Sequence, residues 1–303
     1  MISLLNLFTT NLLPIILIAS IGFFLHRLFR LDPRPLSQIV FYAFSPALVF
    51  NLLISTNMAT ADLFRMVGLA ATVIFLIGLI SLGISRFTKL DRTTTAAFVL
   101  SASFMNSGNY GLSLNQFVLG EAGMAWASIF FITSSMLINS AGVYVAAAGR
   151  QSAKKALIGL VRVPAVYVIP LAFLMRTFHW SLPLVAERTV DILSAGAIPC
   201  MLILLGMQIS NARVAQRRGL LSSVIVLRLI VSPLLAWLLT PLLGLRGISA
   251  QAGILEAAMP SAVFTTVIAT KFDAEPEFAT SAVLATTLLS PLTITPLLAI
   301  LGG

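Results

Sequence analysis

The sequence predicts an all-α polytopic membrane protein with ten transmembrane helices, built as a 5+5 inverted repeat. Three observations lead to this fold class. Apolar residues form 58% of the 303 residues and charged residues only 10%, which fits no ordinary soluble core. The chain divides into ten largely apolar stretches of membrane-spanning length. The fourth and ninth stretches are interrupted at corresponding positions by residues that break helices.

The expected helices are joined by short segments, which leave no room for a separate soluble domain. A span needs about 20 predominantly apolar residues. The expected spans are residues 4–25, 35–56, 63–86, 93–119, 121–149, 156–177, 183–210, 219–243, 248–270 and 277–301. The first stretch lacks a preceding basic segment and a following small-residue cleavage site, so we expect a retained helix rather than a signal peptide.

Lys and Arg residues concentrate in alternate connections between the helices. The first, third, fifth and seventh connections carry Arg27, Arg30 and Arg34; Arg86, Lys89 and Arg92; Arg150, Lys154 and Lys155; and Arg213, Arg217 and Arg218. Positively charged loops stay in the cytoplasm, so we expect both termini outside the plasma (inner) membrane. The lipid bilayer also accounts for the net charge of +9, and no nucleic-acid partner is predicted.

The two interruptions are the most informative feature of the sequence. The first is Met105-Asn106-Ser107-Gly108-Asn109-Tyr110-Gly111, and the second is Glu256-Ala257-Ala258-Met259-Pro260-Ser261. Irregular backbone at membrane depth is tolerated only where it is buried or lines a cavity. A pair of broken spans at matching places in two halves points to the binding site of a secondary transporter.

A duplication explains why the interruptions match. Five helices per half is an odd number, so a duplicated second half must insert upside down. Three pairs of landmarks are separated by nearly constant distances in the sequence: Pro14 and Pro164, Pro46 and Pro199, Met105 and Met259. We therefore expect one five-helix repeat in residues 1–150 and a second, inverted one in residues 151–303.

The same segments resemble those of a known family. Asn106-Ser107-Gly108-Asn109-Tyr110-Gly111-Leu112 resembles the N-x-G-N-Y-G-L signature of the auxin efflux carriers, and Met259-Pro260-Ser261-Ala262 resembles their M-P-S-A segment. Pro46–Phe50 and Leu202–Gly206 resemble further segments of that family. The connection at residues 150–155 is short, so the chain is similar to bacterial members rather than to plant carriers with a long central loop.

The resemblance implies that the helices form two domains with different functions. Helices 1, 2, 6 and 7 would form a scaffold, and helices 3–5 and 8–10 would form a transport domain that moves as an elevator. It also implies an organic anion as substrate, either auxin-like or a small mono- or dicarboxylate. The family is related in architecture to the bile-acid/sodium symporters, in which a Glu just before the ninth-helix break looks like a sodium ligand.

The breaks suggest how an anion is selected. Each second half-helix begins at the membrane centre, where its free N–H groups and positive dipole end favour a carboxylate. The expected substrate-binding residues are Asn51, Ser55, Asn106, Ser107, Gly108, Asn109, Tyr110, Gly111, Met259, Pro260 and Ser261. Two kinked but continuous helices are the alternative for the breaks. Interhelical hydrogen bonding is the alternative for Asn51 and Ser55, which lie one turn apart.

Glu256 is the strongest single candidate for a functional residue, because burying a charged side chain near the bilayer centre costs free energy. Three roles are open: coupling to H⁺ or Na⁺, with Asn109 as a further ligand, substrate gating, or structural pairing with the polar fourth helix. Arg228 could pair with Glu256, bind substrate, or extend toward the interface. Asn115 and Gln116 are weaker candidates. Arg188 and Asp191 are expected at the interface.

Other classes of function find little support in the sequence. We expect no catalytic residues, no metal site and no cofactor, because no G-x-x-x-x-G-K-[ST] loop or H-E-x-x-H motif occurs and Cys200 is the single cysteine. A channel or membrane sensor with the same fold is the alternative function, and an intramembrane enzyme is a remote one. A homodimer is a further open expectation.

Overall fold

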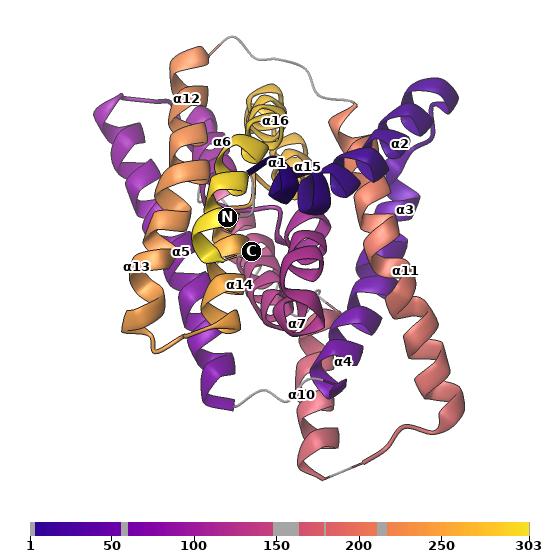
Figure 1. Cartoon of the computed structure of the whole chain (residues 1–303). Helices are drawn as coiled ribbons and strands as arrows, with labels where there is room; N and C mark the ends of the chain where they lie inside the picture. The colour runs from indigo at the N-terminus through magenta and orange to yellow at the C-terminus, as the bar shows by residue number, and fades with distance from the viewer. Residues whose placement is uncertain (1–3, 56–59, 148–163, 179, 211–216, 303) are drawn as a thin grey trace.

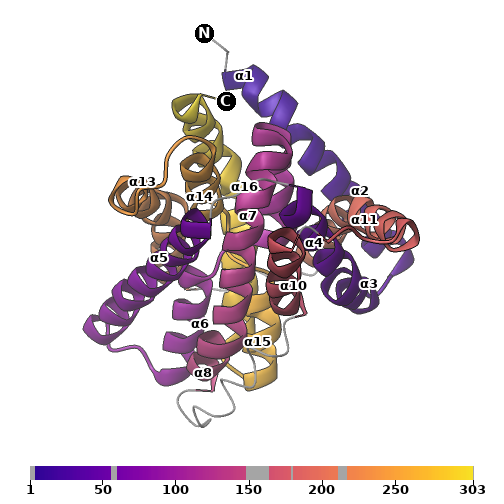
Figure 2. The same ribbon diagram turned by 90° about the horizontal axis from the view of Figure 1, so that it is seen from below.

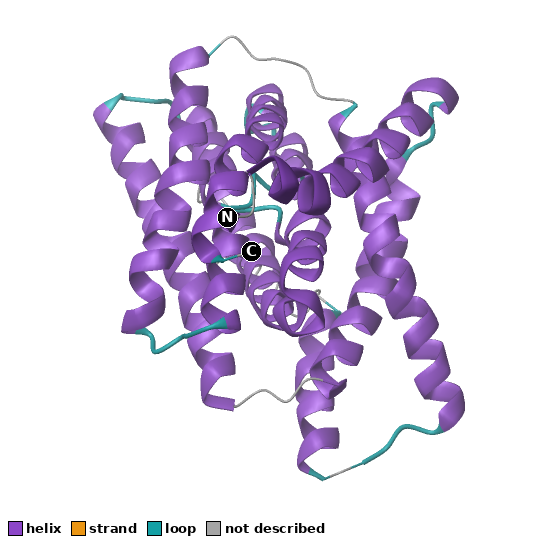
Figure 3. Ribbon diagram, in the orientation of Figure 1, coloured by secondary structure: helices purple, strands orange, loops and turns teal. Residues whose placement is uncertain are grey.

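Helices form nearly all of the regular structure of this chain. The computed structural model describes residues 4–55, 60–147, 164–178, 180–210 and 217–302, and in these ranges the only extended pairing is one isolated bridge. Seven helices in the same ranges are long and apolar enough to cross a membrane. The all-α class is therefore confirmed (Figure 3). Helices suit hydrocarbon because they satisfy their own peptide groups.

The first part of the chain forms three helical stretches, two of which contain a wide π-turn. They are α1 (Leu4–Leu7), η1 (Phe8–Leu12) and α2 (Leu13–Phe29); α3 (Pro33–Ile39), η2 (Val40–Phe44) and α4 (Ser45–Ser55); and α5 (Thr60–Phe87). Each π-turn is followed by a helix whose second residue is a proline, Pro14 or Pro46. Proline has no N–H to donate, and the wider turn rearranges the backbone around the missing bond.

The fourth and fifth expected helices follow as a chain of shorter elements. They are α6 (Arg92–Ser103), η3 (Ser107–Leu112), α7 (Ser113–Leu137), η4 (Ile138–Gly142) and α8 (Val143–Ala146). Gly120 divides α7, because its backbone leaves the helix at φ 65° and ψ −161°. A residue without Cβ adopts this conformation at no steric cost. The boundary falls between the expected spans 93–119 and 121–149.

The second half contains eight described elements, one of them a π-turn. They are α10 (Ala165–Thr177), α11 (Leu184–Ile209), α12 (Arg218–Val226), η5 (Leu227–Val231), α13 (Ser232–Leu242), α14 (Ile248–Ala257), α15 (Phe264–Phe272) and α16 (Pro276–Leu301). Pro233 again follows the π-turn as the second residue of α13. The start of the expected span 156–177 lies outside the described residues.

The helices pack as two groups, which Figure 1 shows on opposite sides of the molecule. In the first, which we name the α11 group, α11 packs along α2, α3 and α4, and α10 packs against α4. In the second, the α14 group, α14 packs against α5, α7 and α13, while α6, α12 and α15 pack against α16. The two groups meet where η3 contacts α11 and where α7 contacts α4 and α10, and the first helical stretch contacts α7 and α16.

Two glycines bring α2 and α11 into backbone contact. A Cβ atom on Gly22 would overlap the backbone of Ile203, and one on Gly206 would overlap the carbonyl group of Ala19. Small residues allow such an approach between membrane helices, where dispersion contacts and not water exclusion hold helices together. The α11 group is thus built around one tight helix crossing.

A cluster of charges joins the starts of three helices of the α14 group. The guanidinium of Arg217, before α12, lies 3.3 Å from a carboxylate oxygen of Glu275, before α16, and donates to the Thr94 hydroxyl of α6 at 2.7 Å. Asp91 caps α6 by accepting hydrogen bonds from the Thr93 hydroxyl and the Thr94 amide. These bonds from Thr93 and Thr94 hold the pKa of Asp91 below its usual value.

The two ends of the described chain lie close together. The first helix, α1, packs beside the last, α16, and Figure 2 shows α1 near the yellow C-terminal end of α16.

Candidate functional site

Two non-helical segments meet inside the α14 group, and we call them the paired breaks: residues 104–106, between α6 and η3, and residues 258–263, between α14 and α15. Met105 and Ser261 form an antiparallel bridge. The Asn106 amide donates to the Pro260 carbonyl at 2.7 Å, and the Ala262 amide donates to the Phe104 carbonyl at 2.9 Å. The alternative of kinked but continuous helices is therefore wrong.

The end of α6 receives its hydrogen bonds from the second half of the chain. The last carbonyls of any helix lack partners within that helix. Here the Ser261 hydroxyl donates to the Ser101 carbonyl at 2.7 Å. The guanidinium of Arg228 donates to the carbonyls of Ala102 and Ser103 at 2.8 and 3.0 Å. With the bond from Ala262 to Phe104, four consecutive carbonyls are satisfied, in a place where water could not reach them.

Arg228 donates hydrogen bonds to the backbone at both breaks. Its side chain is completely buried, and it also donates to the Ala257 carbonyl at the end of α14, at 2.8 Å, and to the Ser232 hydroxyl. A cation beside the C-terminal carbonyls of a helix is stabilising, because these carbonyls form the negative end of the helix dipole. The expected extension of Arg228 toward the interface is wrong. The ion pairs of the described residues do not include it either, so direct pairing with Glu256 is not observed.

Glu256 contacts the start of the second half-helix of the first break. The Asn115 amide group donates to Glu256 Oε1 at 3.1 Å and to the Gly111 carbonyl at 2.9 Å. A Cβ atom on Gly111 would lie 2.6 Å from Glu256 Oε2, so a larger residue here would require the carboxyl group to move. The Ser107 hydroxyl also lies beside it.

Three oxygen atoms around this carboxyl group have no hydrogen-bond partner among the described residues. They are Glu256 Oε2, Asn115 Oδ1 and Ser107 Oγ. Buried polar atoms are nearly always paired, and an exception calls for an explanation such as an ion or a proton. The structure thus pairs Glu256 with the polar fourth helix, as one of its three expected roles requires, and leaves acceptors unsatisfied beside it.

The remaining candidates of the first break point in different directions. The Asn106 side chain is buried with its amide nitrogen unpaired among the described residues. Asn109 is partly exposed and donates to Gln208 Oε1 of α11 at 3.4 Å. Tyr110 points toward α16, where its hydroxyl accepts a hydrogen bond from Ser290 at 3.4 Å. Gly108 lies against the Phe131 ring.

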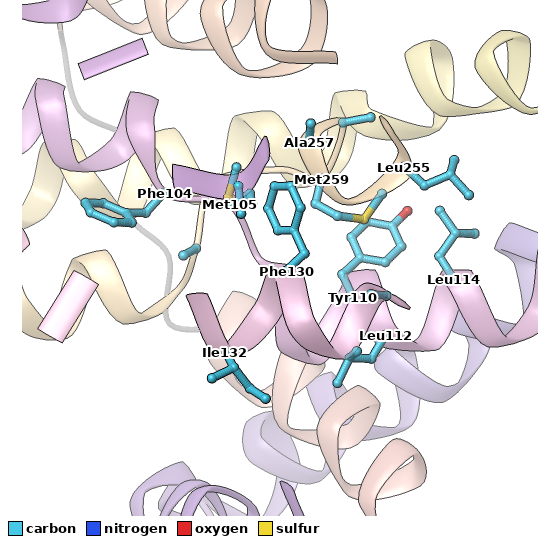
Figure 4. Packing of buried hydrophobic residues seen from close by; sticks show 14 of the residues in the cluster. Phe104, Met105, Tyr110, Leu112, Leu114, Phe130, Ile132, Leu255, Ala257 and Met259 are labelled. Carbon is cyan, nitrogen blue, oxygen red and sulfur yellow. The ribbon is translucent and has the colours of Figure 1, made fainter. Parts of the chain in front are cut away.

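The second break is buried more uniformly. Met259 and Tyr110 belong to one cluster of buried hydrophobic residues, and Figure 4 shows the Met259 side chain beside the Tyr110 ring. Ser261 is fully buried, and its amide donates to the Thr286 hydroxyl at 3.0 Å. Pro260 contributes its carbonyl to the pairing described above. Asn109 is therefore the candidate of the two breaks whose side chain reaches the other helix group.

Asn51 and Ser55 lie elsewhere, in a cleft with a volume of about 840 Å³. The Asn51 amide donates to Asp191 Oδ1 of α11 at 3.0 Å, and the Ser55 hydroxyl donates to the Asn51 carbonyl at 2.8 Å. The lining of the cleft contains both residues but none from the paired breaks. The lining also contains Asp191, which was expected at the interface, and Arg176, Trp180 and Glu187, which sequence reasoning did not assign to a site.

Long apolar helices around paired breaks with buried polar groups define an integral membrane protein of the transporter class. The chain belongs to the family described as "Membrane transport protein", which matches residues 7–298. The family predicted from the two break motifs, that of the auxin efflux carriers, is thereby confirmed.

Three relatives with full-length similarity carry transporter names. An "Uncharacterized transporter" of Methanothermobacter thermautotrophicus is 26% identical over 291 residues, which cover 93% of this chain and 94% of the relative. An "Uncharacterized transporter" of Methanocaldococcus jannaschii is 25% identical over 297 residues, covering 93% and 95%. A "Putative malonate transporter" of Rhizobium meliloti is 28% identical over 277 residues, covering 87% and 85%.

Proposed function

We propose that this protein is a secondary transporter that carries small organic anions through the membrane by an elevator movement. The pairing of Met105 with Ser261 supports this function best, because it places two helix breaks side by side within the α14 group. The name of the Rhizobium relative supports carboxylates such as malonate as the substrate class.

The proposed architecture is ten spans in two inverted repeats, residues 1–150 and 151–303, with the half-helices crossing at the paired breaks. The α11 group would be the static scaffold, and the α14 group would move. Two observations support this division: the backbone contact of α2 with α11 at Gly22 and Gly206, and the packing of α2 with α11 and of α14 with α7, which is more extensive than any contact between the groups. The contact of α1 with α16 fits two ends on the same side of the membrane, and the positions of Lys and Arg in the connections favour the outer side of the inner membrane.

The proposed substrate site lies where the second half-helices begin, at η3 and α15. Their N-terminal N–H groups and dipole ends attract a carboxylate. The candidates at the breaks would form it, with the partly exposed Asn109 as the side chain that contacts the anion. Asn51 and Ser55 would act from the separate cleft, on the path of the substrate rather than at the breaks.

Glu256 would carry the coupling ion, either H⁺ or Na⁺. The unpaired oxygen atoms of Glu256, Asn115 and Ser107 support this role, because a cation would satisfy them. In proteoliposomes, the Glu256→Gln variant should lose the dependence of uptake on imposed proton and sodium gradients but keep exchange of substrate. A wild type that ignores both gradients would be a uniporter, and the coupling role would be wrong.

Counterflow separates a carrier from a channel. Liposomes containing the purified protein are loaded with unlabelled malonate, malate or indole-3-acetate, and the labelled compound is added outside. A carrier accumulates label transiently above equilibrium and saturates, whereas a channel does neither. Absence of counterflow with every carboxylate would contradict the proposed substrate class.

A cross-link tests the elevator movement itself. In a Cys200→Ser background, cysteines replacing Asn109 and Gln208 would join η3 to α11, the two residues being in contact across the groups. Because Asn109 is itself replaced, the reference is the same double-cysteine variant before cross-linking, measured at a saturating substrate concentration. We expect the cross-link to stop its counterflow and reduction to restore it to that reference level. A matched pair replacing Gln251 and Leu301, which contact each other within the α14 group, should leave transport unchanged. Full transport with the first pair cross-linked would contradict the movement.

A further inference from the structure

The α14 group contains two completely buried charges of opposite sign. Among the residues that the structure describes, Arg228 and Glu256 are the charged residues with fully buried side chains. Arg228 lies on η5, and Glu256 lies on α14. They are linked through the backbone, because Arg228 donates to the carbonyl of Ala257, the residue that follows Glu256.

In the part of the chain that the structure describes, no other charged side chain is buried beside them. Of the elements packed against α14, α13 has no charged residue and η3 contributes the titratable Tyr110. The charged residues of α5 lie near its ends, at Asp62, Arg65 and Arg86, and that of α7, Glu121, directly follows the Gly120 that divides the helix. The elements packed against η5 likewise have charges only near their starts: Arg92, Arg218 and Glu277. None of these charged residues is buried. Among the described residues, the interior of the group therefore holds one basic and one acidic side chain, Arg228 and Glu256.

This balance has a physical consequence for a body that crosses a membrane. Moving a net charge through a low-dielectric layer is unfavourable, whereas a body with balanced charges avoids that cost. Arg228 cannot release its charge, because it is held by carbonyls at both breaks and guanidinium remains protonated in proteins. Neutralisation of Glu256 by a bound cation would leave one positive charge, which an anion can balance.

We propose that Arg228 is the fixed counter-charge of Glu256, so that one monovalent cation crosses the membrane with each substrate anion. This inference rests on the proposed function and specifies its charge stoichiometry. A singly charged anion then moves without net charge, and doubly charged malonate moves with one negative charge.

The charge balance can be tested without a substrate. Thermal unfolding in detergent is measured for wild type, Arg228→Gln, Glu256→Gln and the double variant. We expect the double variant to unfold at a higher temperature than Arg228→Gln, because it no longer contains an unbalanced buried carboxylate. Arg217→Gln, which removes an exposed cation, is the control and should combine additively with Glu256→Gln. Additive losses for Arg228 and Glu256 would overturn the counter-charge role.

The stoichiometry is tested by the reversal potential of labelled malonate flux in proteoliposomes with a potassium diffusion potential. We expect one negative charge per malonate for the wild type and two for Glu256→Gln. An equal ratio in both proteins would overturn the inference. If malonate does not move at all, the proposed substrate is wrong, while the unfolding experiment still decides the charge balance.

Discussion

The Ser261 hydroxyl of one helix break donates a hydrogen bond to the Ser101 carbonyl of the other, at 2.7 Å and with both side chains fully buried. This bond joins residues 160 positions apart, at the end of a half-helix whose last carbonyls have no partner within it. The two breaks are thus one structural unit, and single substitutions in either should affect both.

Ser261→Ala should destabilise the protein by about 1–3 kcal/mol, because the Ser101 carbonyl would remain buried without a donor. Thermal unfolding in detergent measures the loss. Thr270→Ala is a suitable control, since its hydroxyl is exposed and bonds only within its own helix. Equal stabilities of the two variants would contradict the importance of the bond between the breaks.

Gly206→Ala should cost about 1–3 kcal/mol, because the added Cβ would force α11 away from the Ala19 carbonyl of α2. Gly68→Ala in α5 provides the contrast. Nothing lies within 4 Å of a Cβ atom there, so this variant should unfold at or above the wild-type temperature. Wild-type stability of Gly206→Ala would contradict the close backbone contact between α2 and α11.

Asp91 should make stability depend on pH in the acid range. Its pKa is lowered in the folded protein, chiefly by the hydrogen bond from the Thr93 hydroxyl and then by those from Thr94. Its stabilising effect is therefore complete above the unfolded pKa of about 3.9 and is lost as the pH falls through the lower folded pKa. Wild type should be more stable than Asp91→Asn at neutral pH, and the difference should shrink below about pH 4.

Two further variants of the same position separate charge from capping. Asp91→Ala should lose about 0.5–2 kcal/mol at neutral pH, because it removes the hydrogen-bond acceptor of the cap. Asparagine retains an acceptor and should lose less. A difference between wild type and Asp91→Asn that stays constant down to strongly acid pH would contradict the lowered pKa.

Asn109→Ala should weaken carboxylate binding at least several-fold and leave the unfolding temperature nearly unchanged, because this side chain is partly exposed and has one long bond to Gln208. Isothermal titration with the substrate found by counterflow measures the effect. Asn139→Ala, which removes an amide bonded within its own helix, is the control. Wild-type affinity of both Asn109→Ala and Pro260→Ala would remove the paired breaks as the substrate site.

Labelling of single cysteines tests the predicted orientation of the protein in the membrane. In a Cys200→Ser background, an impermeant thiol reagent should modify a cysteine at Ser3 or Gly302 in intact cells. A cysteine at Lys89 should react only after permeabilisation. The reverse pattern would invert the predicted topology.

The positions of the breaks could be predicted because their causes are local. Gly, Asn and Pro interrupt a helix through their own backbone properties, and Gly120 ends a half-helix in the same way. The role of Arg228 could not be predicted, since its acceptors lie 126, 125 and 29 positions away. Its depth in the span left pairing with Glu256, substrate binding and extension toward the interface open, whereas in the structure Arg228 donates to backbone carbonyls at both breaks.

The cleft around Asn51 illustrates the same limit. The spacing of Asn51 and Ser55 placed both on one face of a helix, and both indeed line one cleft. Which residues face them depends on how α4 packs against α10 and α11. Asp191, expected at the interface, accepts the Asn51 hydrogen bond. Such partners are set by tertiary packing and leave no signal in the spacing of either segment.

The hydrogen bonds at the end of α6 also constrain how this protein can be made. A ribosome delivers Ser101 to Phe104 into the membrane long before Arg228, Ser261 and Ala262 exist. Until these residues arrive, four carbonyl groups of the nascent chain have no donors in a medium that offers none. The end of α6 can therefore acquire the hydrogen bonds described here only after Arg228, Ser261 and Ala262 have been synthesised and inserted.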